Sequence, residues 1–305
     1  MRNKIVFVLI LTLTSTMASS AQAEQPKSLV IIDTAISADQ TWAQSILIEE
    51  ACFIEYGKCP NGQNFMEGKG SASIQGSAVK DVAMHHGTQM ASIAYQINPS
   101  TKLIMVRIAG LSAKGYTNTY TTKAVVKALN WVKDNSTRLN VGAISLSIGR
   151  SYSQPQCPIE NELRSIIQSL DASNIPVIAS SGNGYNRTKI DYPACISEVV
   201  AIGATDTRYT LRNIPGWIYP IMNLSNSSSD LDFYTLGRYM TTDLNGNRSL
   251  KLGTSAATAA FASYLVREQN KGLTTTQVLT QIRTSLSNAY RSGTEFYPLH
   301  FEITR

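Results

Sequence analysis

Short apolar runs alternate with longer amphipathic segments along most of the chain. The runs are rich in Val, Ile and Leu and lack polar alternation, which is typical of strands buried on both faces of a parallel sheet. They cover residues 28–32, 103–106, 142–146, 176–179 and 199–202.

Apolar residues recur at helical spacing in the segments between and after these runs. Helices are predicted over 122–132, 159–170, 256–266 and 274–287, with Thr274 or Thr275 capping the last. Strand and helix alternation predicts an α/β fold of three layers, with a doubly wound, mostly parallel central sheet and helices on both faces. Chemistry in such folds is expected at the carboxyl ends of the strands.

The first 23 residues have the pattern of a secretory signal peptide. A positively charged start precedes an apolar run at 5–11, and small residues lead to Ala21-Gln22-Ala23, after which cleavage is expected. A membrane span needs about 20 apolar residues, and no run is that long. We expect residues 24–305 to form a single secreted or periplasmic domain with no membrane span.

Composition and charge narrow the function classes. The 305 residues are 43% hydrophobic, which is enough for a large core and argues against disorder. The net charge of +6 falls to +4 when Arg2 and Lys4 leave with the leader, which is too little to indicate a nucleic-acid partner. With three His, four Cys and no Cys-x-x-Cys, a multi-ligand zinc site is not expected either.

Export would place the four cysteines in an oxidising compartment, where disulfides form. Cys52 and Cys59 flank a predicted chain reversal, and Cys157 and Cys195 would then form a second bridge. Four cysteines allow three pairings, so this one is a hypothesis, and free buried thiols are the alternative.

Four polar residues stand at predicted strand ends or helix starts. Asp33 ends the first strand, His86 opens His-Gly-Thr before an apolar helix, Asn183 closes Ser-Ser-Gly-Asn, and Ser255 lies in Gly-Thr-Ser. Serine hydrolysis needs a hydroxyl nucleophile, a His, a carboxylate that orients the His, and oxyanion donors. Each motif alone is weak evidence, whereas all four in this order are specific. An α/β-hydrolase would need a Gly-x-Ser-x-Gly elbow and another order, and neither occurs.

This set resembles the subtilases, the subtilisin-like serine proteases, whose motifs are Asp-Ser/Thr-Gly, His-Gly-Thr, Gly-Asn and Gly-Thr-Ser-Met-Ala. The resemblance runs from about Leu29 to the region of Leu286 and includes 144–149, 192–194, 199–204 and 231–237. It implies a subtilisin-like fold and a secreted serine endopeptidase acting on proteins or peptides.

The resemblance assigns roles by position. Ser255 would attack the scissile carbonyl, His86 would take its proton, and Asp33 would orient the imidazole. Asn183 and the Ser255 N–H would bind the oxyanion, with Thr254 in support. His85 is the rival base, but the His-Gly-Thr frame favours His86. Further substrate-binding residues would be Ser147, Ile148, Gly149, Ser180, Ser181 and Gly182.

Asp191 stands just before Tyr192-Pro193, where the family places the bottom of its S1 pocket. A carboxylate there would pair with a substrate Arg or Lys, which suggests cleavage after basic residues. The alternative is a solvated loop aspartate.

Several positions depart from the family pattern. Ala35 stands where Gly is usual, Ala256 replaces Met, and Ala259 replaces Pro. None of these changes removes a reacting atom, but a catalytically inactive binding protein stays open as the alternative. His300, among aromatic residues near the C-terminus, is expected to be structural.

Asp33 follows the expected cleavage site by only ten residues, so no propeptide domain is recognised. Since parallel sheets fold slowly, this leaves open unaided folding, disulfide support, a separate chaperone, or a toxin-type subunit. No cofactor is expected for the chemistry. Structural calcium is common in the family, but no clear ligand cluster is present.

Overall fold

The computed structural model describes residues 25–74, 80–110, 120–206, 221–289 and 298–299, so the predicted leader and His300 lie outside it. Its strands are β1 Ser28–Asp33, β2 Leu47–Phe53, β3 Phe65–Glu67, β4 Lys102–Arg107, β5 Val141–Leu146, β6 Val177–Ser180, β7 Val199–Thr205, β8 Phe233–Leu236, β9 Arg238–Thr242, β10 Arg248–Leu252 and β11 Pro298–Leu299. Its helices are α1 Thr41–Ile46, the 3₁₀ turn η2 Val82–His85, α2 His86–Ile97, α3 Thr122–Asn135, α4 Asn161–Ala172, α5 Thr254–Gln269 and α6 Thr275–Ala289.

Nine strands form one sheet in the order β11-β8-β7-β6-β5-β1-β4-β2-β3, and only β3 runs antiparallel to its neighbour. The five predicted apolar runs are β1, β4, β5, β6 and β7, which confirms them. β1 lies between β4 and β5, with Ile32 opposite both Val106 and Leu146. The carboxyl ends of these central strands therefore meet at one edge of the sheet.

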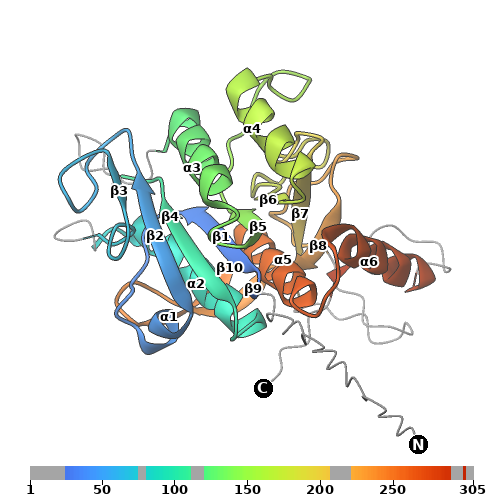
Figure 1. Ribbon diagram of the computed structural model, residues 1–305. Helices are drawn as coiled ribbons and strands as arrows, with labels where there is room; N and C mark the ends of the chain where they lie inside the picture. The colour runs from blue at the N-terminus through green and yellow to red at the C-terminus, as the bar shows by residue number, and fades with distance from the viewer. Residues whose placement is uncertain (1–24, 75–79, 111–119, 207–220, 290–297, 300–305) are drawn as a thin grey trace, which may run out of the picture.

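Helices cover both faces, which confirms the predicted three-layer α/β architecture (Figure 1). Leu29 and Ile31 of β1 pack with α2 and α5, whereas Val30 and Ile32 pack with α3 and α4. Side chains alternate across a strand, so an apolar run with no polar positions can fill both cores.

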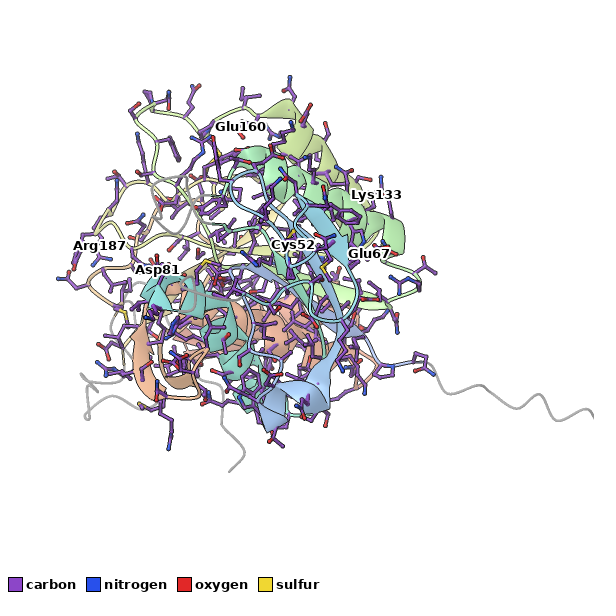
Figure 2. The ribbon with its side chains drawn as sticks, turned by 90° about the vertical axis from the view of Figure 1, so that its left-hand side faces the viewer. Cys52, Glu67, Asp81, Lys133, Glu160 and Arg187 are labelled. Carbon is purple, nitrogen blue, oxygen red and sulfur yellow. A yellow bond between two sulfur atoms is a disulfide. The ribbon has the colours of Figure 1, made fainter. Side chains whose placement is uncertain are left out.

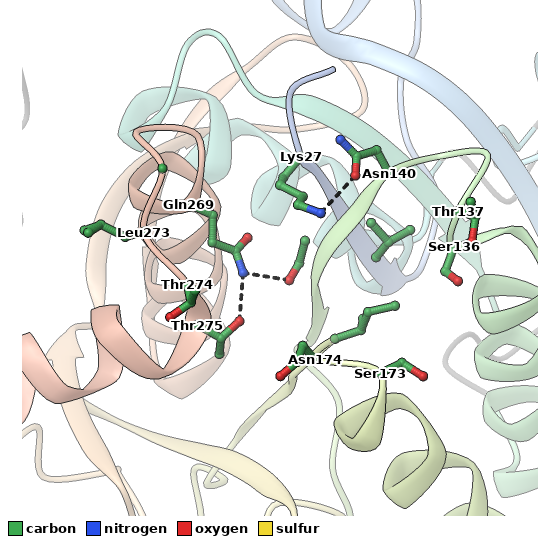
Figure 3. Close-up of a pocket in the computed structure, with 14 residues that line it drawn as sticks. Lys27, Ser136, Thr137, Asn140, Ser173, Asn174, Gln269, Leu273, Thr274 and Thr275 are labelled. Atoms are coloured by element: carbon green, nitrogen blue, oxygen red, sulfur yellow. Dashed lines mark hydrogen bonds between the residues drawn. The ribbon is translucent and has the colours of Figure 1, made fainter. Parts of the chain in front are cut away.

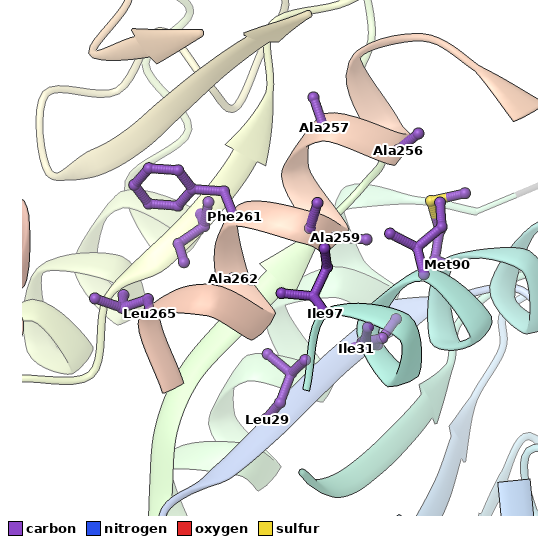
Figure 4. Packing of buried hydrophobic residues seen from close by; sticks show 14 of the residues in the cluster. Leu29, Ile31, Met90, Ile97, Ala256, Ala257, Ala259, Phe261, Ala262 and Leu265 are labelled. Carbon is purple, nitrogen blue, oxygen red and sulfur yellow. The ribbon is translucent and has the colours of Figure 1, made fainter. Parts of the chain in front are cut away.

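α5 carries Ser255 in its first turn and is lined with small residues. Ala256, Ala257, Ala259 and Ala262 are completely buried, and Figure 4 shows Ala259 beside Met90 of α2. Alanines allow close approach of α5 to α2 and to the sheet, because they add little bulk between the backbones. The tight packing fixes where the first turn of α5 points.

Two disulfides are present, Cys52–Cys59 and Cys157–Cys195, which is the pairing favoured from the sequence. Cys52 lies on β2 (Figure 2). Cys157–Cys195 joins the segment between β5 and α4 to the segment between β6 and β7. Within the described residues, no helix is long and apolar enough to cross a membrane.

Candidate active site

A cavity of about 340 Å³ opens at the carboxyl ends of β1, β5 and β6. It is the place where doubly wound sheets usually carry their sites. The predicted residues that line it are Asp33, His86, Ser147, Ile148, Gly149, Ser180, Gly182, Asn183, Asp191, Thr254 and Ser255. Segments more than 200 positions apart along the chain therefore meet here.

Asp33 and His86 are in direct contact. β1 ends at Asp33, whose side chain is fully buried, and α2 begins at His86. His86 Nδ1 lies 2.8 Å from Asp33 Oδ1 and 3.0 Å from Oδ2. The Thr34 N–H donates to Asp33 Oδ1 at 2.7 Å, and the Thr34 hydroxyl accepts from the Gly87 N–H at 2.7 Å. The carboxylate thus holds one ring nitrogen and leaves Nε2 for another partner.

The two adjacent histidines face different surroundings. His85 Nδ1 lies 3.3 Å from Asp243 Oδ2, in the turn between β9 and β10, and His85 does not line the cavity. The structure thus places His86, and not His85, beside Asp33, as the His-Gly-Thr frame suggested.

Ser255 lies in the same cavity, with its hydroxyl turned toward the end of β5. Its Oγ donates to the Ser147 carbonyl at 3.2 Å, and the Ser147 hydroxyl donates to the Ser255 carbonyl at 3.0 Å. No hydrogen bond joins Ser255 to His86 among the interactions of the described residues. The three side chains converge, but the serine contacts β5 in this conformation.

Asn183 is held by the start of α5. Its Oδ1 accepts the Thr254 N–H at 3.0 Å and the Thr254 hydroxyl at 3.1 Å. Its Nδ2 has no hydrogen-bond acceptor in the part of the chain that is described. Gly253 has a φ of 128°, which only glycine adopts readily, and a Cβ there would lie 3.0 Å from Asn183 Oδ1. Because Thr254 occupies the oxygen of the Asn183 amide, Asn183 Nδ2 is available as a donor toward the cavity.

Asp191 lies under two glycines of the cavity wall. A Cβ on Gly182 would come within 2.2 Å of Asp191 Oδ2, and one on Gly149 within 3.3 Å of Asp191 Cβ. Burial raises the pKa of Asp191, and a hydrogen bond from Asn226 Nδ2 at 3.0 Å partly offsets that rise. Asp191 is thus a half-buried carboxylate at the cavity and not a solvated loop residue.

Asn226 was not identified from the sequence. Its Oδ1 accepts the N–H groups of Gly184 and Asn186, both at 2.9 Å, while its Nδ2 holds Asp191. A buried Asn in a Ser/Asn-rich segment gives no local signal of this role. The predicted substrate residue Ser181 also differs from expectation, because its buried hydroxyl donates to the Asn226 carbonyl and it does not line the cavity.

Tyr120 and Lys251 also line the cavity and were not predicted. The Tyr120 hydroxyl donates to the Gly149 carbonyl at 2.7 Å, and burial raises the pKa of Tyr120. Burial lowers the pKa of Lys251, while the charge of Asp33 acts in the opposite direction. The cavity therefore contains charges of both signs.

A larger cavity of about 700 Å³ lies at the amino ends of β1 and β5 (Figure 3). Lys27 donates to Asn140 Oδ1 at 3.0 Å there, and Gln269 bonds Gly142 and Thr275. It contains none of the predicted catalytic residues. Within the described segments, no three His, Cys, Asp or Glu side chains are grouped to hold a metal ion.

Residues 27–297 match the family model described as the subtilase family. The chain belongs to the subtilase family. It is 25% identical to Subtilisin Savinase of Lederbergia lenta over 241 residues, which cover 73% of this chain and 80% of that protein. It is also 25% identical to an alkaline protease of Shouchella clausii, of which the match covers 57%. The solved structure of a cold adapted subtilisin-like serine proteinase matches with a TM-score of 0.62 and 21% identity, over 90% of this subtilase and 88% of that chain.

These matches place the protein among the subtilisin-like serine proteases. The structural match, at such low identity, supports the fold alone. Ala35, which replaces the family's glycine beside the Asp motif, is buried and is not among the described residues with positive φ, so an alanine fits this turn without strain.

Proposed function

We propose that this subtilase is an exported serine endopeptidase that cleaves peptide bonds after Arg or Lys, with Ser255, His86 and Asp33 as its catalytic residues. One observation carries the proposal: these three side chains come from distant segments and line one cavity, with His86 Nδ1 2.8 Å from Asp33.

In the proposed reaction, the Ser255 hydroxyl turns from the Ser147 carbonyl toward His86. Nε2 takes the hydroxyl proton as Oγ bonds to the scissile carbonyl carbon, and Asp33 stabilises the imidazolium. His86 then gives that proton to the leaving amine, and an acyl-enzyme forms. Water then attacks the acyl carbon while His86 takes its proton, the ester bond to Oγ breaks, and His86 returns the proton to Ser255 as the carboxylic acid leaves. These steps use the protein side chains, the substrate and water, so no cofactor is required.

The oxyanion of the tetrahedral intermediate would be bound by Asn183 Nδ2 and the Ser255 N–H. Thr254 supports this role, because it fixes Asn183 Oδ1 through two hydrogen bonds and so orients the amide. A donor that is held in advance needs no reorganisation when charge develops, which is why such groups are effective.

Asp191 supports the preference for a basic residue before the scissile bond. Its carboxylate is half-buried beside the glycines that would flank a substrate side chain, and only Asn226 hydrogen-bonds its side chain among the described residues. A guanidinium or ammonium would provide the missing counter-charge.

Active-site labelling tests the catalytic assignment. A fluorophosphonate probe should label purified mature protein at Ser255 and abolish peptide hydrolysis, and Ser255→Ala should be neither labelled nor active. Ser153→Ala is the control, because it removes an exposed hydroxyl that does not line the cavity and should still be labelled. If folded wild-type protein were unlabelled and inactive, a non-catalytic binding role would replace this proposal.

A peptide library tests the preference. Hydrolysis should be fastest with Arg or Lys at P1, and Asp191→Asn should lower the ratio of kcat/KM for Arg over its neutral isostere citrulline by at least about tenfold. Asp230→Asn, an exposed loop change, should leave that ratio unaltered. Equal turnover of Phe and Arg by the wild type would reject the preference.

We also infer export, which the leader-like residues 1–23 and the two disulfides support. Mass spectrometry of protein recovered outside the cytoplasm should find Glu24 as the mature N-terminus. Protein retained in the cytoplasm with residues 1–23 attached would contradict export without affecting the catalytic proposal.

A further inference from the structure

β10 reverses the polarity expected of an amphipathic strand. Leu250 and Leu252 are 47% and 36% exposed, whereas Ser249 and Lys251, which alternate with them, are less exposed than either leucine. A strand with one solvated face normally buries its leucines and exposes its lysine. This arrangement leaves two leucines in contact with solvent and makes Lys251 less exposed than they are.

Lys251 faces the catalytic cavity, which it lines together with Asp33, His86 and Ser255. In the described part of the chain its ammonium makes no ion pair or hydrogen bond. Burial lowers its pKa and the Asp33 charge raises it, so the ammonium is within electrostatic reach of Asp33. A half-buried cation without a partner is stabilised by any carboxylate brought to it.

Lys251 and Asp191 line the same cavity but belong to different segments of its wall. Asp191 adjoins the segments that follow β5 and β6, and its pKa responds to burial and Asn226. The charge of Asp33 raises the pKa of Lys251. The β9–β10 hairpin that carries Lys251 packs through β9 against α2, the helix that begins at His86. Because the base gives its proton to the leaving amine, the His86 side of the cavity receives the residues after the scissile bond.

We propose that Lys251 is a specificity-determining residue that selects Asp or Glu immediately after the scissile bond, at P1′. Combined with Asp191, it makes a basic residue followed by an acidic residue the preferred cleavage sequence. This inference rests on the proposed function and specifies its substrate further. The bond-breaking steps are unchanged, because Lys251 would contact only the P1′ side chain of the substrate.

The test uses peptides that have Arg at P1 and differ only in Glu or Gln at P1′. At low ionic strength, the wild type should hydrolyse the Glu peptide about five times faster or more in kcat/KM. The Glu/Gln ratio should fall to about one in Lys251→Met and below one in Lys251→Glu. Lys133→Glu, on the exposed face of α3 (Figure 2), changes the net charge equally and should keep the wild-type ratio.

The outcomes separate this inference from the proposed function. If the wild type hydrolysed the Gln peptide and its Glu/Gln ratio of kcat/KM were near one, the proposed role of Lys251 would be overturned. The proposed function would be unaffected by that result. An unchanged ratio in Lys251→Met, with a shifted pH profile on the Gln peptide, would show that Lys251 acts on Asp33 and His86 instead. Absence of hydrolysis and of Ser255 labelling would overturn both proposals.

Discussion

Asn183 and Asp191 acquire their proposed properties from a small number of contacts. Thr254 occupies the oxygen of the Asn183 amide and leaves its nitrogen unbonded within the described structure. Asn226 donates one hydrogen bond to Asp191, which is too little to cancel the effect of burial on that carboxylate. At the residue scale, function is therefore set by which atoms are already satisfied.

Replacing Asn183 by Ala should lower kcat by about a hundred- to a thousandfold, the usual effect of removing one oxyanion donor. KM should change little, because the donor acts mainly in the transition state. Steady-state kinetics on one Arg peptide would measure this. Asn130→Ala, on the exposed side of α3, is the control and should match the wild type.

The preference for Arg should weaken on acidification at a higher pH than an ordinary aspartate would give. Burial raises the pKa of Asp191 above 3.8, so its charge is lost earlier as the pH falls. The ratio of kcat/KM for Arg over citrulline peptides isolates this effect, because any group that acts on the scissile bond itself affects both substrates equally. A ratio constant down to pH 4 would contradict the assignment of Asp191.

At the scale of elements, the start of α5 connects the nucleophile to the oxyanion donor. Gly253 has φ 128° and ψ 178°, a conformation that is essentially restricted to glycine. It allows β10 to end and α5 to begin with the Thr254 N–H directed at Asn183. Buried alanines then hold the helix against α2 and the sheet.

Gly253→Ala should therefore reduce both stability and activity. Backbone strain should lower the free energy of unfolding by about 1–3 kcal/mol, and displacement of Asn183 should lower kcat. Gly246→Ala is the matched control: it has a φ of 81° in the β9–β10 turn and open space around a Cβ, so it should lose stability while its kcat is kept. Urea unfolding and peptide kinetics on both variants would distinguish strain from damage to the site.

On the scale of the whole molecule, the disulfides restrain very different lengths of chain. Cys52 and Cys59 are 7 positions apart, whereas Cys157 and Cys195 are 38 apart and bridge segments beside the Asp191 loop. A crosslink that closes a longer loop removes more conformational entropy from the unfolded chain.

Removal of the Cys157–Cys195 pair by double alanine substitution should lower the free energy of unfolding by about 4 kcal/mol. Removal of Cys52–Cys59 should lower it by about 2 kcal/mol. Urea unfolding in a Ser255→Ala background, which prevents self-digestion, would give both values. The reverse ranking would mean that native-state packing around Cys52 outweighs loop entropy.

The central strands could be predicted because they are buried on both faces, but β2 and the β9–β10 hairpin could not. β2 contains Glu50, whose buried carboxylate accepts the N–H groups of Gly70 and Ala72 at 2.7 and 3.2 Å. This acidic residue interrupts the apolar pattern, and its partners lie 20 and 22 positions away along the chain. In β10 the alternation is present, but nothing local shows that Lys251 faces inward.

The sequence by itself determined the five central strands, the main helices, and the Asp, His, Asn and Ser motifs, because burial on both faces and glycine-dependent turns leave local signatures. Only the tertiary structure decided that His85 contacts Asp243, that Asn226 holds Asp191, and that Lys251 faces the cavity. These outcomes depend on hydrogen bonds and burial between segments far apart in the chain, and such pairings leave no local pattern in the sequence.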